Sequence, residues 1–249
     1  MVLPLLFVSL LFLMSAGGSV TSTAPNDWYF KPNQDHKQPA VANEVPLEGY
    51  DVLYCGGETE KKVSITFDAG YENGYHAQIL DTLRDKGVTA AFFLDGNFVR
   101  QNGALVQRMA AEGHIVGNHT LNHADMASLT DFDTYSQQIT GWNALVEELG
   151  LTPSGYFRYP AGRYSERALE YNKRLGLKSV FWSFAYYDWV QDDQPTPDAA
   201  LDKILGRMHN GCVLLLHSTS ATNAQILGTL IDRLREEGYE IVPLGALAG

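Results

Sequence analysis

Short apolar segments alternate with helix-length amphipathic segments from residue 63 to the end of the chain. Residues 63–67 read VSITF, a run of β-branched and aromatic residues that predicts a strand. Residues 74–86 then carry apolar side chains at helical spacing, and Gly87 ends that helix. The same unit recurs along the chain. We expect further strands at 89–94, 114–116, 156–157, 179–183, 213–216 and 240–242, and further helices at 104–111, 132–149, 166–174, 197–208 and 223–236.

This alternation predicts an α/β fold of parallel strands covered by helices, because neighbouring parallel strands need a crossover and a helix is the usual one. Both an open sheet and a barrel fit the pattern. In either fold the loops after the strands meet at one end of the sheet, where catalytic groups gather. Five ionisable residues follow predicted strands: Asp68, His119, Arg158, Asp188 and His217. We therefore expect one site at that end.

The first 24 residues have the composition of an export signal. The apolar run from Met1 to Met14 is shorter than the ~20 residues that span a bilayer, and small residues follow it. The segment contains no Lys or Arg, which leaves an uncleaved membrane anchor as the alternative. Either assignment of residues 1–24 predicts that the folded part is exported and lies outside the membrane.

Residues 25–62 are rich in Pro, Asn, Asp and Gly and show no apolar periodicity. We expect this segment to be an extension that packs on the surface of a single catalytic domain at residues 63–249. The sequence contains no internal repeat or low-complexity tract that would indicate a solenoid or a disordered chain.

The composition is that of a globular domain and argues against a nucleic-acid binder. Of the 249 residues, 45% are hydrophobic and 19% are charged, which is enough apolar material for one sizeable core. The 18 Lys and Arg residues against 29 Asp and Glu residues give a net charge of −11. Phosphate binding requires clustered cations, so an acidic chain suits a neutral or partly cationic substrate instead.

Cys55 and Cys212 are the two cysteines of the chain. An exported protein meets a compartment in which a disulfide can form, but the sequence does not show whether these residues touch. Cys212 opens an apolar strand and is equally well interpreted as a small buried side chain. Neither residue has the spacing of a metal ligand.

A carboxylate and a histidine pair are the first candidates for chemistry. Asp68 follows a strand and precedes a glycine-containing turn, so it is either a catalytic carboxylate or a helix N-cap. His119 and His123 are four residues apart and can bind one cation, since neutral imidazole is the commonest nitrogen ligand of zinc-like metals. A surface histidine pair would give the same string. The residues between them, Thr-Leu-Asn, lack the glutamate of the zincin proteases.

Three further strand-end residues suggest acid–base chemistry. Arg158 can orient a catalytic carboxylate and hold it ionised, or it can form an ordinary ion pair. His217 ends an apolar strand and can donate a proton to a leaving nitrogen. Asp188 can hold the His217 ring and raise its basicity.

The segment at residues 181–189, FWSFAYYDW, is unusually aromatic for a loop. Sugar rings have apolar CH faces that stack on aromatic side chains, so the segment suggests a carbohydrate ligand. Tyr187 and Trp189 are the residues that we expect to be exposed to substrate. Core packing is the alternative for Trp182 and Phe184.

The ordered motifs TFDAG, HTLNH, RYPAG, AYYDW and LLLH resemble the five motifs of the polysaccharide deacetylases, carbohydrate esterase family four, with its NodB homology domain. The resemblance covers residues 63–247 and implies an irregular parallel (β/α) barrel. The strings TFDAGYENGY, RYPAGRYS and FWSFAYYDW, with DWYFK at 27–31, are most similar to one branch of that family. This branch removes acetyl from muramic acid during δ-lactam formation in bacterial, usually spore-cortex, peptidoglycan.

The resemblance implies a mechanism and a role for each site residue. A water that is bound to a metal or activated by Asp68 attacks the acetamide carbonyl, and His217 then protonates the departing amine. The backbone N–H of Ala161 helps the cation to stabilise the oxyanion. The implied set comprises catalytic Asp68, Arg158, Asp188 and His217, metal ligands His119 and His123, and substrate or oxyanion contacts Tyr159, Ala161, Tyr187 and Trp189.

One position departs from the family pattern. Many relatives have a second Asp directly after the base, which completes an Asp-His-His metal site, whereas this chain has Ala69. The resemblance implies a divalent cation (Zn, Mn, Co or Mg), with Asp68, Glu72, Asn73 or water left to complete its shell. A weak requirement for metal, or none, is the alternative.

Other functions compete with de-N-acetylation of muramic acid. A glycoside hydrolase would pair Asp68 with Glu72 or Asp188, but it leaves the histidine pair and Arg158 unexplained. Deacetylation of GlcNAc in peptidoglycan or a chitin-type polymer is the alternative within the family, and a non-catalytic glycan-binding relative is a third. We expect the partner to be a glycan strand of peptidoglycan, with no nucleic acid and no obligate protein partner, and the protein to be a monomer.

Overall fold

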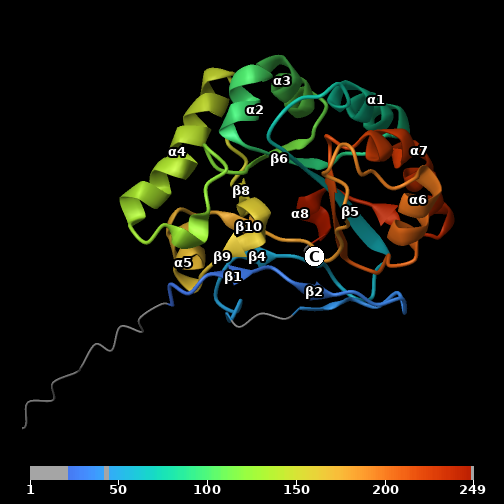
Figure 1. The fold of residues 1–249 in the computed structure, drawn as a ribbon, viewed down its shortest axis with the longest axis horizontal. Coiled ribbons are helices and arrows are strands. Elements are labelled where there is room, and N and C mark those ends of the chain that lie inside the picture. The colour runs from blue at the N-terminus through green and yellow to red at the C-terminus, as the bar shows by residue number, and fades with distance from the viewer. Residues whose placement is uncertain (1–21, 42–44, 248–249) are drawn as a thin grey trace, which may run out of the picture.

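The computed structural model describes residues 22–41 and 45–247 (Figure 1). The strands of its main sheet are β4 Val52–Leu53, β5 Lys62–Ala69, β6 Ala91–Leu94, β7 Ile115–Asn118, β8 Tyr156–Phe157, β10 Lys178–Val180, β11 Cys212–His217 and β12 Glu240–Ile241. The α-helices are α1 His76–Lys86, α2 Gly96–Gln101, α3 Gly103–Ala111, α4 Phe132–Glu148, α5 Glu166–Arg174, α6 Pro197–Leu205, α7 Ala221–Glu236 and α8 Leu244–Leu247. The alternation of strand and helix is therefore confirmed.

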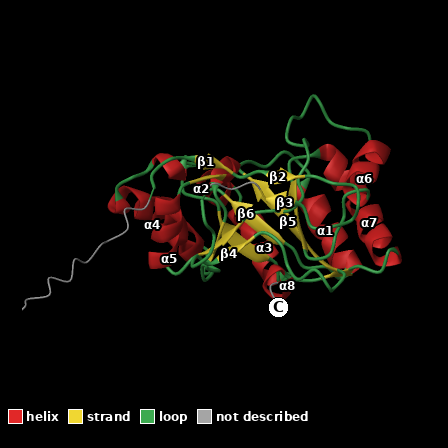
Figure 2. Cartoon of the chain, turned by 90° about the horizontal axis from the view of Figure 1, so that it is seen from below, coloured by secondary structure: helices red, strands yellow, loops and turns green. Residues whose placement is uncertain are grey.

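The main sheet is wholly parallel and curled. Its strands follow the order β11-β5-β6-β7-β8-β10-β4, and β12 pairs with the first residues of β5. Helices α1 to α7 lie around the outside of the strands (Figures 1 and 2). Isolated bridges join the edges, Cys55 with Cys212 and Phe184 with Leu214. This is the expected irregular parallel (β/α) barrel.

Successive side chains along a strand point to opposite faces of the sheet, and they pack in a large core under the helices and a smaller core inside the barrel. In β6, Phe92 and Leu94 pack in the large cluster beneath the helices, whereas Phe93 belongs to the cluster on the other face. Helix α8 contributes Leu244 and Leu247 to that inner cluster. Both faces of the sheet are thus buried, which explains why its strands read as nearly continuous apolar runs.

The N-terminal extension contains one strand of the main sheet. Its other strands are β1 Asn26–Asp27, which pairs with β9 Arg163–Tyr164, and the pair β2 Phe30–Lys31 and β3 Ala40–Val41. Trp28 of this extension stacks on Phe181 at 4.2 Å between ring centroids. Strand β4, however, pairs with β10 inside the sheet. The sequence did not predict this strand, because a two-residue strand has no detectable periodicity.

Two other elements differ from the prediction. Helix α2 was missed because it has six residues, too few to show helical spacing, and its start is marked only by the Asp95 side chain accepting from Phe98 N at 2.8 Å. Strand β10 ends at Val180 rather than at residue 183. The residues after Val180 contact β11 instead of extending β10, and Ser183 N donates to Val213 O of β11 at 3.1 Å.

The termini and cysteines complete the description. The predicted signal or anchor at 1–24 lies outside the described residues, apart from its last three. Within residues 22–41 and 45–247, no helix is long and apolar enough to cross a membrane. Cys55 and Cys212 lie opposite each other in the antiparallel bridge, and both are free thiols.

Candidate active site

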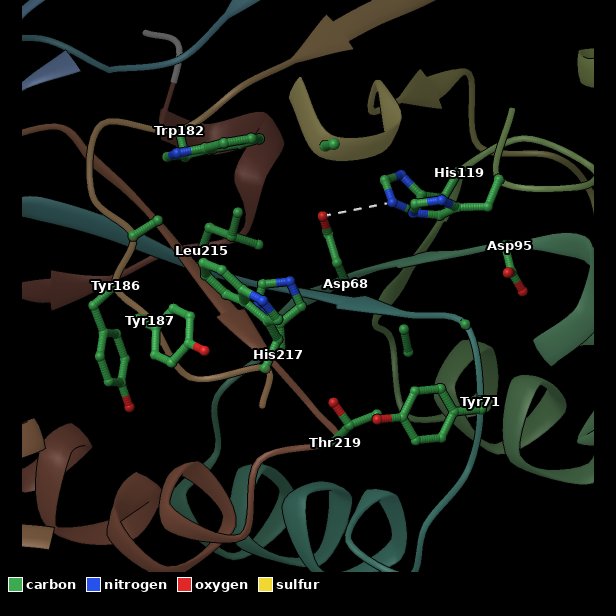
Figure 3. Close-up of a pocket in the computed structure, with 16 residues that line it drawn as sticks. Asp68, Tyr71, Asp95, His119, Trp182, Tyr186, Tyr187, Leu215, His217 and Thr219 are labelled. Atoms are coloured by element: carbon green, nitrogen blue, oxygen red, sulfur yellow. Dashed lines mark ion pairs between the residues drawn. The ribbon is translucent and has the colours of Figure 1, made fainter. Parts of the chain in front are cut away.

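A cavity of about 850 Å³ opens at the carboxyl ends of the parallel strands (Figure 3). It lies where the strand-end rule placed the site. Its lining comprises Asp68, Ala69, Gly70, Tyr71, Asp95, His119, His123, Ala161, Trp182, Ala185, Tyr186, Tyr187, Trp189, Leu215, His217 and Thr219. Three predicted residues are not in this lining and are fully buried: Arg158, Tyr159 and Asp188.

Asp68 is part of strand β5 and forms a buried ion pair with Arg158. Arg158 Nη1 lies 2.7 Å from Asp68 Oδ1, and Nη2 donates to Thr66 Oγ1 at 2.9 Å. Burial alone would raise the pKa of the Asp68 carboxyl, but Arg158, with His119 and His217, holds it below its ordinary value. Asp68 is therefore a carboxylate at neutral pH. It does not cap a helix, because the N-cap of α1 is Tyr75.

His119 presents one ring nitrogen to Asp68 and anchors the other. Its Nδ1 lies 2.9 Å from the carbonyl oxygen of Arg158, which can only accept, so Nδ1 carries the proton. Its Nε2 lies 3.7 Å from Asp68 Oδ2. Burial is the main reason that the pKa of His119 falls to about 4, so the ring is neutral. The centroid of the His123 ring lies 5.0 Å from that of the His119 ring, and the two ring planes are 72° apart.

These donors fit a two-histidine metal site with an incomplete protein shell. The neutral His119 ring leaves Nε2 free to bind a cation, and His123 stands beside it in the lining. Glu72 Oε1 accepts from Gly74 N at 2.5 Å and Asn73 Nδ2 donates to Thr219 O at 2.7 Å, and neither residue is in the cavity lining. Among the residues described, no three His, Cys, Asp or Glu side chains are grouped to hold a metal ion.

His217 is held by a buried carboxylate network. Asp188 Oδ1 lies 2.7 Å from His217 Nδ1, and Asp188 Oδ2 accepts from His217 N at 2.9 Å and from Asn223 Nδ2 at 2.5 Å. Burial lowers the pKa of His217, but the hydrogen bond and charge of Asp188, with Asp68, outweigh it, and the net pKa is raised. His217 can therefore carry a proton near neutral pH, and its Nε2 is free to deliver it.

Several residues at the site have a strained, left-handed backbone conformation. Four non-glycine residues among those described have positive φ, and three of them are Thr120 (71°), His123 (52°) and Ala161 (52°). His123 and Ala161 line the cavity, and Thr120 follows the ligand candidate His119. A left-handed non-glycine residue costs of order 1–3 kcal/mol, and such residues cluster at functional sites. Ala161 thus lines the cavity in an unusual backbone conformation.

The aromatic residues divide between the cavity and the core. Tyr187 and Trp189 are 46% and 49% exposed, as predicted, and the Trp189 ring lies 5.5 Å from that of His217. Trp182 lines the cavity, whereas Phe184 is buried in the core. Tyr71 was missed by sequence reasoning although it is 42% exposed in the lining.

The prediction that Tyr159 contacts substrate was wrong. Its side chain is fully buried, its hydroxyl accepts from Asn172 Nδ2 at 2.9 Å, and its ring stacks on Phe181 at 5.5 Å. Successive side chains of extended backbone point to opposite sides, so Tyr159 points away when Arg158 points to Asp68.

Asp95 was missed although the rule that found the other residues applies to it. It directly follows strand β6, it is buried, and it lines the cavity. Asn223 was missed because it lies inside helix α7, and Thr66 because it lies within β5. No sequence signal distinguishes these two from ordinary polar residues.

Comparisons with known proteins agree with this geometry. The model of the family "Polysaccharide deacetylase" matches residues 56–180. The chain is 37% identical to peptidoglycan-N-acetylmuramic acid deacetylase PdaA of Bacillus subtilis over 233 residues, 91% of this chain and 88% of that protein. The structure of PdaA, a family 4 carbohydrate esterase, matches with a TM-score of 0.87 at 37% identity, covering 91% of this chain and 97% of that one.

Two further relatives widen the comparison. A family 4 carbohydrate esterase from Bacillus anthracis is 32% identical, with a TM-score of 0.74 over 92% of this chain and 98% of that one. Peptidoglycan-N-acetylglucosamine deacetylase PgdA of Listeria monocytogenes is 31% identical over 192 residues, 77% of this chain and 40% of that protein. The chain therefore belongs to the polysaccharide deacetylase family and is a hydrolase of N-acetyl amide bonds.

Proposed function

We propose that this enzyme removes the N-acetyl group of N-acetylmuramic acid in peptidoglycan, the step that precedes closure of the muramic δ-lactam. The observation that carries this proposal is the likeness to PdaA, which extends over 91% of the chain at 37% identity. The site supports it, because an ionised Asp68 and a His217 of raised pKa are register partners on β5 and β11. Amide hydrolysis needs both a base and an acid.

The side chains divide the reaction between them. Asp68 takes a proton from water as the water oxygen bonds to the acetamide carbon, and Arg158 keeps Asp68 ionised before the attack. The backbone N–H of Ala161 stabilises the resulting oxyanion. His217 then protonates the nitrogen, the C–N bond breaks, and acetate and a free amine leave. Without that proton the amine would depart as an amide anion.

A divalent cation fits beside the acid–base pair of Asp68 and His217. Held by His119 and His123, it would polarise the acetamide carbonyl. Two imidazole nitrogens suit zinc or cobalt better than magnesium, which prefers oxygen ligands. Because Ala69 supplies no donor, we propose that the cation is held weakly.

The cavity walls suit a sugar. Trp182, Tyr187 and Trp189 supply aromatic faces around the acid–base pair, and sugars stack on such faces through their CH groups. Within residues 22–41 and 45–247 the cavity lining contains no Lys or Arg. The glycan is therefore recognised by stacking and hydrogen bonding rather than by a basic groove.

Deacetylation of N-acetylglucosamine is the second candidate, and the 31% identity to PgdA favours it. Two rivals find less support. A glycoside hydrolase needs a second carboxylate that faces the substrate, but Asp188 is fully buried and Glu72 is not in the cavity lining. Asp95 is the other carboxylate of the lining, and it accepts from Phe98 N as the N-cap of α2. A binding-only relative would have no need of the Asp68–Arg158 and His217–Asp188 pairs.

Acetate release from defined glycans distinguishes these candidates. The purified protein, with divalent metal added, is incubated with muramic-acid-containing glycan strands stripped of their peptides and, separately, with chitin oligomers. We expect acetate and free muramic amine from the first substrate. Release from chitin oligomers alone would contradict the muramic acid assignment but not the chemistry.

We also propose that the enzyme is exported, because its substrate is a cell-wall glycan and residues 1–24 have the composition of an export signal. Fractionation of producing cells tests this proposal. The protein should be found in the cell wall, in the medium or on the outer face of the cell membrane. Recovery from the cytoplasm alone would contradict the proposal that the enzyme is exported.

A further inference from the structure

A second set of polar side chains links two loops beside the cavity and has no part in the acid–base chemistry. His76, in the first turn of α1, is fully buried, and its Nε2 lies 2.8 Å from the hydroxyl of the equally buried Ser218. Its Nδ1 contacts the carboxylate of Glu72. Asn73 Nδ2 donates to the carbonyl of Thr219 at 2.7 Å. We call the four side chains Glu72, Asn73, His76 and Ser218 the loop clamp.

The clamp does not set the distance between base and acid. Asp68 and His217 are direct register partners in paired strands, so the sheet already fixes their spacing. The clamp instead joins the loop at 70–74, which comes after β5, to residues 218–219, which come after β11. A buried imidazole that bonds to a serine hydroxyl at Nε2 and contacts a carboxylate at Nδ1 allows little relative movement of these loops.

The two joined loops carry one wall of the cavity. Tyr71 and Thr219 belong to the lining and lie together on one side of it (Figure 3). Tyr71 also accepts a hydrogen bond from Gln191 Nε2 at 2.9 Å, which connects this wall to the residues that follow the aromatic segment. An exposed tyrosine in such a place offers a stacking face for a sugar ring.

We infer that the loop clamp positions the Tyr71–Thr219 wall for the sugar ring and so sets the affinity for glycan rather than the rate of the chemical step. Glu72, Asn73, His76 and Ser218 are positioning residues. The inference rests on the proposed function, since it concerns the glycan that this cavity takes. Glu72 and Asn73, two candidates for the metal shell, are thereby assigned a different role.

The test compares Ser218→Ala and Asn73→Ala with a matched control in the full chain. Ser183→Ala removes a second buried serine–histidine pair, since Ser183 Oγ lies 2.8 Å from His209 Nε2, but it lies near the start of β11 and outside the cavity lining. The dissociation constant of peptide-free glycan strands is followed by tryptophan fluorescence, together with KM, kcat and the melting temperature. Trp182 and Trp189 in the lining supply the signal.

We expect both clamp variants to bind glycan roughly two- to tenfold more weakly, the range of one lost hydrogen bond, with KM raised in step and kcat nearly unchanged. Ser183→Ala should lower the melting temperature and leave the dissociation constant unchanged. The inference is overturned if the clamp variants bind as tightly as the wild type, or if kcat falls while KM does not change. If Ser218→Ala fails to fold, the dissociation constant of Asn73→Ala, at a partly exposed position, tests the inference alone.

Measurements of glycan binding and of acetate release distinguish a failure of this inference from a failure of the proposed function. A wild type that binds glycan strands but releases no acetate would contradict the proposed function, and the dissociation constants would still decide the clamp. Acetate release with unaltered glycan binding in both variants would contradict the clamp alone.

Discussion

Asp68 and His217 face one another across a single strand spacing, about 4.8 Å in a β-sheet. Their neighbours shift the two pKa values in opposite directions. Arg158 lowers the pKa of the Asp68 carboxyl, and Asp188 raises the pKa of the His217 imidazole. One group is thus ready to accept a proton and the other to donate one, and each residue's role depends on a buried partner that the substrate does not reach.

Asp188→Asn should lower the pKa of His217, because it removes the carboxylate that raises it. His217 must be protonated to act as an acid, so activity declines as pH rises through its pKa. The basic limb of the profile of kcat/KM against pH should therefore move to lower pH. Asp192→Asn, an exposed acid in the same loop, should leave the limb in place. An unmoved limb in Asp188→Asn would refute the assignment of His217 as the acid.

Ala161→Gly should stabilise the fold, because glycine adopts the left-handed conformation (φ 52°) that is costly for alanine here. The expected gain in the free energy of unfolding is up to about 1 kcal/mol, measured by denaturant titration. Ala144→Gly is the matched control in the middle of α4, where helical backbone predicts a loss of about 1 kcal/mol. Equal losses in both variants would show that Ala161 is not strained.

At the scale of elements, long periodic segments were predictable and short ones were not. Helices α4 and α7 and strands β5 and β11 follow from their spacing alone. Strand β4 has two residues and pairs only through backbone that comes from a distant part of the chain, so no local pattern marks it. Helix α2 is similarly short, and its cap, Asp95, is the only local sign of its start.

The candidate site shows the same division. The strand-end rule found the residues whose places depend on the sheet, such as Asp68 and His217. It did not find Asn223, which reaches Asp188 from a helix packed on the sheet. It could not say that Glu72 and Asn73 lie outside the cavity lining, because their contacts are with other parts of the chain: Glu72 contacts His76 of α1, and Asn73 donates to Thr219 in the loop after β11.

The closure of the barrel can be tested at Gly56. A Cβ atom there would overlap the carbonyl oxygen of Leu247 and lie 3.3 Å from Gly211 Cα, so the backbone itself would have to move. Gly56→Ala should destabilise the protein by about 1–3 kcal/mol, read as a lower denaturation midpoint. Gly57→Ala is the control, because a Cβ atom at Gly57 meets nothing within 4 Å. A neutral Gly56→Ala would mean that this contact does not hold the barrel edges together.

At the scale of the whole molecule, one rigid barrel supplies both the acid–base pair and the histidine pair, while the loops between supply the glycan walls. The N-terminal extension contributes to this rigidity through β4 and through Trp28, whose Nε1 donates to Trp182 O at 2.8 Å. Trp182 lines the cavity, so the extension supports the site although it carries none of its chemistry.

Metal dependence should be present but easily reversed, because the protein offers a pair of imidazoles and Ala69 adds no donor. Acetate release should fall on treatment with a chelator and return on addition of zinc or cobalt. His123→Gln should abolish the response to metal, whereas the exposed His36→Gln should not change it. Full activity in excess chelator would show that the histidine pair serves the reaction without a cation.

Asp68→Asn provides the sharpest test of de-N-acetylation by this site, since it retains the shape of the side chain and removes its basicity. Acetate released from peptide-free, muramic-acid-containing strands is measured for the wild type, for Asp68→Asn and for Asp133→Asn, an exposed control on α4. We predict a loss of at least about 100-fold in Asp68→Asn, the usual size of a general-base contribution, and none in the control. Acetate release by Asp68→Asn at the wild-type rate would contradict the assignment of this cavity as the active site.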